Sequence, residues 1–452
     1  MPDATRSLVE LVDDFSSILA NDPGPLAPDR QEYVHNLHGA GVEDQVALLE
    51  RQIRLTRGGQ LYYFSGMRGT GKSTELKRLE LMLNGRPNTR AYVVDALDYI
   101  SDTHELDTLD LLLVVAAAFA HRLSQDDALG EPQLDQEGPL KRFSTWLQSD
   151  VEIQGATVAG IKVDFKRQQQ SIIQRIRAFD LARQERVMAE CQAFITDMAD
   201  AVRQKWKIEK VVLMVDSLER LRGVGSGAAQ MFERIVKVFY GDERRLRVRD
   251  VQMVFSVPPY LPYLTNVKAF VQLFMLASVR VCQPPDVARR QPRPEGLDAL
   301  ETLVTKRFAD WQRVLSRDAL HKLCIHSGGD LRQLLRRLLA STLEHAAFLP
   351  PERLPLQAGD EVIQTVLDAH RVDFEDLVVQ AEYPLLKSIA ERNALELPER
   401  SDLPVLAHFF DLRAVLNYRN GKDWLDINPL LWPLIDSWTP PAPHASPAAG
   451  SA

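Results

Sequence analysis

The stretch Gly66 to Ser73, GMRGTGKS, matches the pattern G-x-x-x-x-G-K-[ST] at every fixed position. Glycines let backbone N–H groups turn toward an anion without a Cβ clash, and the helix that follows directs its positive end at the same anion. Lys72 would then reach the β- and γ-phosphates, while the Ser73 hydroxyl would join the shell of a Mg²⁺ ion. A glycine-rich turn with a surface lysine is the alternative. We predict a triphosphate site whose loop contacts are Gly66, Met67, Arg68, Gly69, Thr70, Gly71, Lys72, Ser73 and Thr74.

A carboxylate that holds the metal is expected at the end of a neighbouring buried strand. The stretch VVLMVDSLERL supplies one, because five apolar residues lead directly into Asp216. Asp216 would hold Mg²⁺, unless it merely caps a helix. Glu219 is the candidate for polarising the attacking water, and a surface glutamate is the competing interpretation. Asp95 and Asp98, at the end of another expected strand, are further options.

Two other positions fit sensors of the γ-phosphate. Ser256 ends the apolar run VQMVFSV, where its hydroxyl would face the phosphate or the attacking water; the alternative is a buried, internally bonded serine. In SGGDLR, Asp330 is a plausible N-cap. Arg332 would then lie in the first helical turn and reach back to the γ-phosphate, unless it is an ordinary exposed arginine.

A run of arginines just before the expected sensor strand is a candidate for an arginine that acts on a neighbouring copy. The residues are Arg244, Arg245, Arg247 and Arg249. Charge runs of this kind usually form a solvated face, so that interpretation stays open beside the functional one.

The composition is that of a soluble globular protein with more than one domain. The chain has 452 residues, 45% hydrophobic and 26% charged, and a net charge of -8 that opposes a general nucleic-acid-coating role. Its three cysteines, Cys191, Cys282 and Cys324, form no CxxC pair and fit a reducing cytoplasm. The most apolar run, Leu111 to Ala120, is too short to cross a bilayer. We therefore expect a cytoplasmic protein without a membrane partner.

Alternating strands and helices indicate an α/β fold, a parallel sheet flanked by helices. The expected strands are near-continuous apolar runs, as in sheets that are covered on both faces. They span 61–64, 91–96, 210–216 and 251–257. The expected helices of this region span 73–84, 107–123 and 227–240.

Proline-rich breakers and changes of pattern divide the chain further. Residues 1–40 should form a helix and linker, and residues 41–290 the phosphate-binding core, with an insertion at about 97–209 that includes a hairpin at 151–165. A helical lid is expected at 291–372. Residues 373–438 combine helices with Asn420-Gly421, a signal for a type I′ hairpin, and suggest a winged-helix-like domain. Residues 439–452 have the composition of a disordered tail.

In this order the motifs resemble those of the AAA+/STAND branch of P-loop ATPases. The resemblance implies ATP and Mg²⁺ as ligands, a Walker A motif at Gly66–Ser73 and a Walker B motif ending at Asp216, with Ser73 and Asp216 at the metal. It also places Tyr33 and Val34 where such proteins cover the adenine, although plain packing explains them equally well. The residue after Asp216 is Ser217, not glutamate, and D-x-x-E spacing is closer to STAND proteins, in which hydrolysis is often slow and resets a switch.

The resemblance therefore implies a slow regulatory ATPase that changes conformation or assembly with its nucleotide. Its expected partner is a second copy or an effector protein, and such bacterial relatives often act in defence. A DNA-binding initiator or transposition-type ATPase is the alternative, and a nucleotide-bound scaffold without hydrolysis is a third. DNA is not favoured, because residues 373–438 hold 6 Lys or Arg against 12 Asp or Glu.

Overall fold

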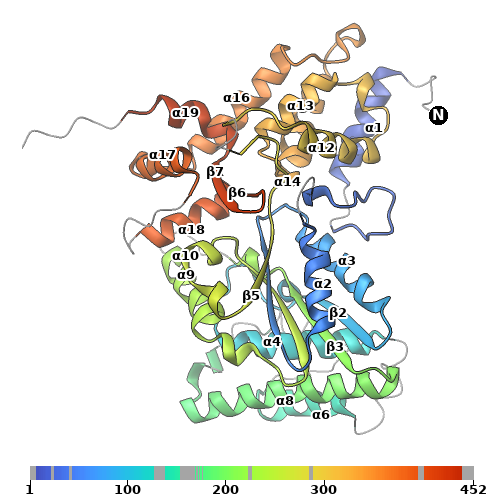
Figure 1. Cartoon of the computed structure of the whole chain (residues 1–452), viewed down its shortest axis with the longest axis vertical. Helices are drawn as coiled ribbons and strands as arrows, with labels where there is room; N and C mark the ends of the chain where they lie inside the picture. Colours follow the sequence, from blue (N-terminus) through green and yellow to red (C-terminus); the bar gives the residue numbers. More distant parts are fainter. Residues whose placement is uncertain are drawn as a thin grey trace, which may run out of the picture.

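The computed structural model of the chain (Figure 1) contains a five-stranded parallel sheet below a helical upper part. It describes residues 7–21, 25–39, 43–126, 138–152, 168, 172, 174–175, 177–221, 227–284, 289–394 and 402–439. The expected hairpin at 151–165 and the expected tail at 439–452 lie almost entirely outside these residues. The predicted α/β fold, a parallel sheet flanked by helices, is confirmed.

The sheet has the order β2-β3-β4-β1-β5, and all neighbouring strands are parallel. Its strands are β1 (Leu61–Gly66), β2 (Thr89–Asp95), β3 (Lys210–Asp216), β4 (Val251–Val257) and β5 (Gln272–Leu276). The first four match the sequence prediction within two residues at each end. The short edge strand β5 was missed, because its QLFML run follows β4 without the helix-length spacing that marked the others.

Alternate residues of the central strands face two separate cores. Tyr63, Val215 and Phe255 belong to the larger core, whereas Phe64 and Met214 belong to a smaller one on the opposite face. Helices α2 (Gln45–Leu55) and α3 (Lys72–Asn84) close the smaller core. Because each strand buries both faces, its sequence is continuously apolar and not alternating.

The other face of the sheet is covered by helices from the segment that we expected to be an insertion. Helix α4 (Thr108–Ser124) packs on β2 and on α8 (Leu181–Trp206), and α6 (Pro139–Ser149) packs on the outside of α8. Fourteen of the 17 residues of α4 are buried, so its apolar run belongs to the protein core. Among the described helices, none is both long and apolar enough to span a membrane.

Helix α9 and the π-helical turn η5 complete this layer. They span Ala228–Val236 and Lys237–Gly241, and Phe239 of η5 contacts the rings of Tyr63 and Phe255 in the sheet.

The helical upper part begins at α12 (Pro294–Arg307) and continues through α13 (Arg317–His326) to α16 (Glu361–Glu375). Between them runs one continuous helical stretch, which consists of α14 (Leu331–Gln333), the π-helical turn η9 (Leu334–Leu339) and α15 (Ala340–Ala346). The N-terminal helix α1 (Leu8–Ala20) packs on α15, and Phe15 stacks on Phe308 with ring centroids 4.6 Å apart. Figure 1 shows α1 beside these helices and not beside the sheet.

The described C-terminal part contains three α-helices, a 3₁₀ turn and an antiparallel hairpin. The elements are α17 (Tyr383–Arg392), α18 (Leu403–Leu412), β6 (Val415–Arg419), β7 (Asp423–Ile427), η13 (Pro429–Leu431) and α19 (Trp432–Ser437). The hairpin is where the sequence placed it, but the type I′ turn was wrong. Residues 420–422 form a three-residue loop in which Gly421 has a positive φ and Asn420 does not, whereas a type I′ turn needs both.

Candidate nucleotide-binding site

The glycine-rich loop joins β1 to α3 at the carboxyl end of the sheet, as the motif requires. Gly69 and Gly71 adopt φ of +87° and +90°, values that favour glycine. Lys72 begins α3 and is almost fully buried, and its Nζ donates to the carbonyl oxygens of Gly66 (2.8 Å) and Met67 (2.7 Å). The loop therefore folds around its own lysine.

Glu219 and Asp216 lie at the same edge. The Oε1 atom of Glu219 is 3.2 Å from Nζ of Lys72, and both side chains are nearly inaccessible to water. Ser217, between the two carboxylates, has a φ of +71° and starts the 3₁₀ turn Leu218–Arg220. That left-handed residue brings Glu219 back toward the loop, and no pattern in the sequence indicated it.

The pKa values of the two carboxyl groups are shifted in opposite directions. Burial raises the pKa of Asp216 to about 7, and the negative charge of Glu219 adds to the effect. Burial also opposes ionisation of Glu219, but Lys72 and hydrogen bonds outweigh it and lower the pKa of that group. Asp95, which pairs with Asp216 in the β2–β3 register, has a pKa raised by burial as well. This edge of the sheet therefore holds a cluster of carboxyl groups. The positive charge beside them is too small to keep all of them ionised.

These groups fit a hard divalent cation. Oε2 of Glu219 is buried without a hydrogen-bond partner among the described residues, and the Ser217 side chain interacts with Asp95. The hydroxyl of Ser73 interacts with Asp216 and lowers its pKa. Carboxylate and hydroxyl oxygens are the ligands that Mg²⁺ takes in phosphate sites. Asp216 and Ser73 are the residues that would hold it.

Ser256 lies at the carboxyl end of β4, where we expected it, but its side chain is engaged inside the protein. It is fully buried on β4, in register with Phe64 of β1, and it does not line the cavity described below. Its Oγ accepts the N–H of Leu218 at 3.0 Å. Of the two interpretations, the structure favours the buried, internally bonded serine, whose hydroxyl fixes the turn that carries Glu219; a contact with the γ-phosphate or the attacking water stays a prediction.

A cavity of about 550 Å³ opens in front of the loop, a size suited to a nucleotide. Seven of the nine loop residues line it, from Arg68 to Thr74. Gly66 and Met67 do not, and Met67 has no exposed surface; their carbonyl oxygens accept from Lys72.

The segment 25–39, here called the strap, forms one wall of this cavity. Tyr33 and Val34 line it, as the resemblance implied. The Tyr33 hydroxyl donates to Glu75 at 2.7 Å, and the Tyr33 carbonyl accepts from Nζ of Lys306 in α12. Burial raises the pKa of the Tyr33 hydroxyl well above its usual range. The strap thus connects the phosphate-loop helix with the upper helices.

Thr74 also serves the strap. Its Oγ1 accepts the backbone N–H of Leu26 at 3.1 Å, so the hydroxyl that we expected to contact a phosphate is engaged by the strap.

The opposite wall comes from the upper helices and includes Arg332. Asp330 caps their helix as predicted, because its Oδ1 accepts the N–H of Gln333 at 2.7 Å. Arg332 lines the cavity, and burial, together with the positive charges of Arg413, Arg220 and Arg336, lowers the pKa of its guanidinium. Within the described residues no ion pair or hydrogen bond of that guanidinium is found. The guanidinium of Arg332 lies close to these other positive charges, and an anionic ligand in the cavity would reduce their mutual repulsion.

Several lining residues had no signal in the sequence. They are Pro25, Leu26, Leu37, His38, Arg220, Leu303, Arg307, Leu331, Leu335 and Arg336. They reach the cavity only because the strap and the upper helices fold over the loop. The arginine run before β4 does not line it, and Arg244 and Arg249 are each 88% exposed.

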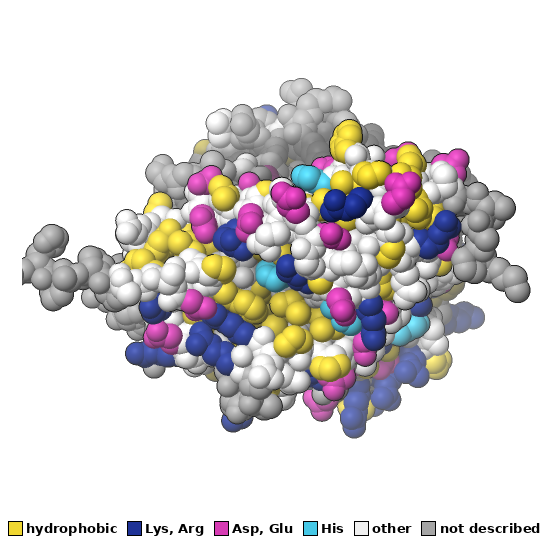
Figure 2. Space-filling view, turned by 90° about the horizontal axis from the view of Figure 1, so that it is seen from above, with side chains coloured by type: hydrophobic (Ala, Val, Ile, Leu, Met, Phe, Trp, Pro, Cys, Tyr) yellow, Lys and Arg dark blue, Asp and Glu magenta, His cyan; other side chains and the backbone are white. Residues whose placement is uncertain are grey.

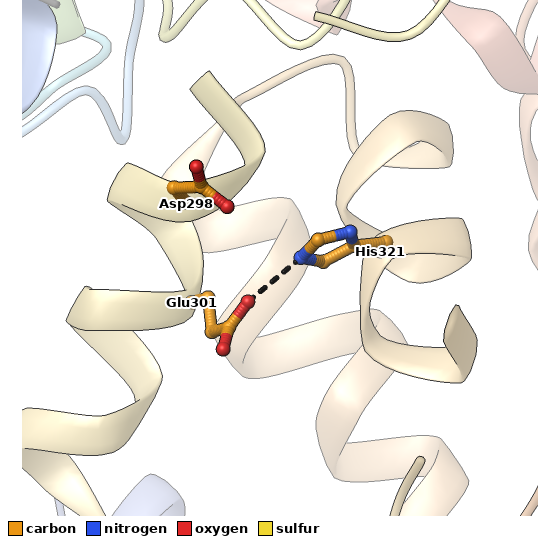
Figure 3. Close-up of side chains that lie close together, drawn as sticks. All are labelled: Asp298, Glu301 and His321. Atoms are coloured by element: carbon orange, nitrogen blue, oxygen red, sulfur yellow. Dashed lines mark hydrogen bonds and ion pairs between the residues drawn. The ribbon is translucent and has the colours of Figure 1, made fainter. Parts of the chain in front are cut away.

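A second cluster of potential metal ligands lies on the upper helices (Figure 3). His321 Nε2 is 2.9 Å from Oε2 of Glu301, and Asp298 is adjacent. Arg317 makes ion pairs of 2.7 Å with both carboxylates. The cluster is a neutralised salt-bridge network, and it does not add to the site.

Comparisons with known proteins place no family name on the chain. No family model and no curated protein matches it. Among solved structures, one similar chain is the Aeropyrum pernix ORC2 protein in ADPNP–ADP complexes, with 11% identity, a TM-score of 0.36, and coverage of 90% of this chain and 97% of that one. Another is from Drosophila ORC bound to DNA, with 14% identity, a TM-score of 0.27, and coverage of 91% and 94%.

Proposed function

We propose that the chain binds ATP with Mg²⁺ and hydrolyses it as an AAA+-type regulatory ATPase. The observation that carries the proposal is the convergence of Lys72, Asp216 and Glu219 on one edge of the sheet, in front of a cavity that Arg332 closes from above. Phosphate binding needs the loop and lysine, the metal needs Asp216 and Ser73, and hydrolysis needs a carboxylate near the γ-phosphate. The bound Mg²⁺ would neutralise charge on the phosphates during transfer.

In this mechanism Glu219 orients and deprotonates water, and Lys72 holds the phosphates. In the structure the two pair with each other, so a γ-phosphate that takes Lys72 releases Glu219 toward water. Arg332 contacts the γ-phosphate from the upper helices, which act as a lid over the loop. Hydrolysis removes the γ-phosphate, so the lid is then held less tightly to the loop. ATP can favour the closed form only as far as it binds that form better.

We further propose that the C-terminal part is a winged-helix-like domain that responds to the lid. Tyr418 Oη donates to the carbonyl of Gly328 at 2.8 Å, and Arg413 lies 3.7 Å from Asp330. Both partners belong to the SGGDLR motif that also carries Arg332. Arg413 and Arg419 are paired with carboxylates, which supports a protein-directed switch over DNA binding.

The test of the site is Lys72→Ala, with ATP binding measured by isothermal titration. Lys141→Ala, on the exposed face of α6, is the matched control. We expect Lys72→Ala to abolish binding and Lys141→Ala to leave it unchanged. ATP binding of wild-type affinity in Lys72→Ala would refute the site.

DNA binding by the full chain is tested separately. The affinity of the full chain for a DNA duplex is measured at several salt concentrations. An affinity that falls steeply with rising salt, and that is lower in Arg419→Glu, would favour the alternative of a DNA-binding initiator.

A further inference from the structure

Arg220 directly follows Glu219 and belongs to the same 3₁₀ turn, Leu218–Arg220. Both residues line the nucleotide cavity. Two contacts hold the backbone of Arg220 in place: its N–H donates to the carbonyl of Ser217 at 3.0 Å, and its own carbonyl accepts from the guanidinium of Arg68 in the glycine-rich loop. The turn that brings the carboxylate of Glu219 to the cavity therefore brings a cation beside it.

The guanidinium of Arg220 is not neutralised by a neighbouring side chain. It makes no ion pair and no hydrogen bond among the described residues. Burial raises the pKa of Asp95 and lowers that of Arg332, and the charge of Arg220 opposes the first shift and adds to the second. Arg220 is therefore close both to the carboxyl groups at the edge of the sheet and to Arg332 on the wall that the upper helices form.

Positive charge that lacks a partner is concentrated at this cavity. On the upper face of the molecule, by contrast, basic side chains are interspersed with acidic ones (Figure 2). Arg220 comes from the sheet and Arg332 from the upper helices, and two guanidiniums at close range repel each other until an anion binds between them. The anion expected there is the outermost phosphate of a triphosphate held by the glycine-rich loop, because Arg220 is the neighbour of Glu219, which pairs with Lys72.

We propose that Arg220 contacts the γ-phosphate of the ATP bound to its own chain and stabilises the negative charge that develops there during hydrolysis. Water attacks the γ-phosphorus, and a P–O bond to water forms while the bond to the β,γ-bridging oxygen breaks. The water proton passes to Glu219, and ADP leaves with the electron pair of the broken bond. Arg220 takes part in no proton transfer; its guanidinium forms hydrogen bonds to the phosphoryl oxygens that are strongest in the transition state.

The inference rests on the proposed ATPase and extends it, because one chain would supply every charged side chain that the reaction needs. An arginine supplied by a second molecule makes hydrolysis depend on association, whereas an arginine in cis does not. The rate of phosphate release per chain should therefore be independent of protein concentration. Arg244 and Arg249, the candidates for action on a neighbouring copy, are each 88% exposed and should be dispensable.

Three variants test the role of Arg220. Arg220→Ala removes the guanidinium, Arg220→Lys keeps the charge without the planar fork of donors, and Arg186→Ala, on the exposed face of α8 outside the cavity, is the matched control. In single-turnover experiments with Mg²⁺, Arg220→Ala should release phosphate about 10²–10³-fold more slowly than the wild type, the loss typical of removing one donor to transition-state charge. Arg220→Lys should fall between these two rates, and Arg186→Ala should match the wild type. Affinity for a non-hydrolysable ATP analogue should change far less than the rate.

A transition-state analogue separates catalysis from folding. ADP with aluminium fluoride should bind the wild type more tightly than ADP alone, and Arg220→Ala should lose this gain but keep its affinity for ADP. Wild-type hydrolysis in Arg220→Ala, a gain that persists in this variant, loss of its ADP binding, or a rate per chain that rises with protein concentration would each overturn the inference and leave the ATPase standing. A wild type that binds no ATP or releases no phosphate would instead refute the proposed function, and the inference with it.

Discussion

At the scale of single residues, the site is defined by ionisable groups that are buried together. Lys72 and Glu219 form a pair with almost no exposed surface, and Asp216 beside them has a pKa raised by burial and by Glu219. Breaking such a pair leaves an uncompensated buried charge, which is strongly destabilising. The carboxylates are therefore replaced by isosteric amides below, and the Tm and circular dichroism of Lys72→Ala are measured beside its ATP binding, so that chemistry and folding can be separated.

Glu219→Gln is the first such substitution. It keeps the shape of the side chain and removes the base, so phosphate release should fall by about 10²–10⁴-fold. ATP affinity should stay near that of the wild type, because Lys72 and the loop remain. The measurement is single-turnover phosphate release, with Glu233→Gln on the exposed face of α9 as control. Hydrolysis at the wild-type rate would remove Glu219 from the mechanism.

Asp216→Asn tests the metal and its pH dependence. With the folded pKa raised to about 7, the group contributes stability that is fully present below the unfolded pKa of about 4 and is lost progressively as pH rises from there to 7. Metal-free Asp216→Asn should therefore have a higher Tm than metal-free wild type at about pH 8 and nearly the same Tm at about pH 4. Mg²⁺ should stabilise the wild type at the higher pH and leave the variant unaffected. Equal Tm differences at both pH values would show that Asp216 does not titrate as described.

At the scale of elements, the SGGDLR motif is the contact between the loop and the upper helices. A Cβ on Gly69 would lie 2.8 Å from Cβ of Arg332 and 3.1 Å from Oδ1 of Asp330. On its other side, a Cβ on Gly328 would meet Leu416 of β6 at 2.2 Å. Loop, motif and hairpin are therefore packed in series, and none can move far without the next.

Gly69→Ala tests the first of these contacts. The alanine must adopt a positive φ, at a cost of about 1–2 kcal/mol, and must also push the motif away. Gly58→Ala is a matched control, because Gly58 has a φ of +72° and nothing within 4 Å of the added Cβ. We expect both to lower stability, and Gly69→Ala alone to weaken ATP binding, as titration would show. Equal ATP affinity in the two variants would mean that the motif does not help to hold the nucleotide.

The sequence predicted the parts of the site that are local and missed those that depend on packing. The loop, Asp216 and the Asp330 cap are set by neighbours in the chain, and the structure has them in place. The position of Ser256 depends on the register of β4 against β1 and on the turn at Ser217. The role of Thr74 depends on a strap that starts about 50 residues earlier, so no local pattern could have indicated it.

At the scale of the whole molecule, distant parts of the chain converge on the upper helices. The N-terminal helix packs there through Phe15 and Phe308, the strap is held there by Lys306, and the C-terminal hairpin binds there through Tyr418. The sheet carries the glycine-rich loop, so the cavity lies between the part that holds this loop and the part to which both ends of the described chain attach. A nucleotide that joins the two walls would therefore stabilise the molecule as a unit.

The last prediction separates ATP from ADP at this scale. A ligand present at about 100 times its Kd stabilises the folded state by about 2.7 kcal/mol, and tighter binding at equal concentration stabilises it more. If Arg332 contacts the γ-phosphate, the wild type should show a larger rise in Tm with a non-hydrolysable ATP analogue than with ADP. Arg332→Ala should lose that difference and keep the rise that ADP produces. Arg337→Ala is the control, because Arg337 lies on the same helical stretch but does not line the cavity. If the rise in Tm is still larger with the ATP analogue than with ADP when Arg332 is replaced by alanine, the lid does not sense the γ-phosphate through this residue. The coupling from nucleotide to C-terminal hairpin would then lose its physical basis.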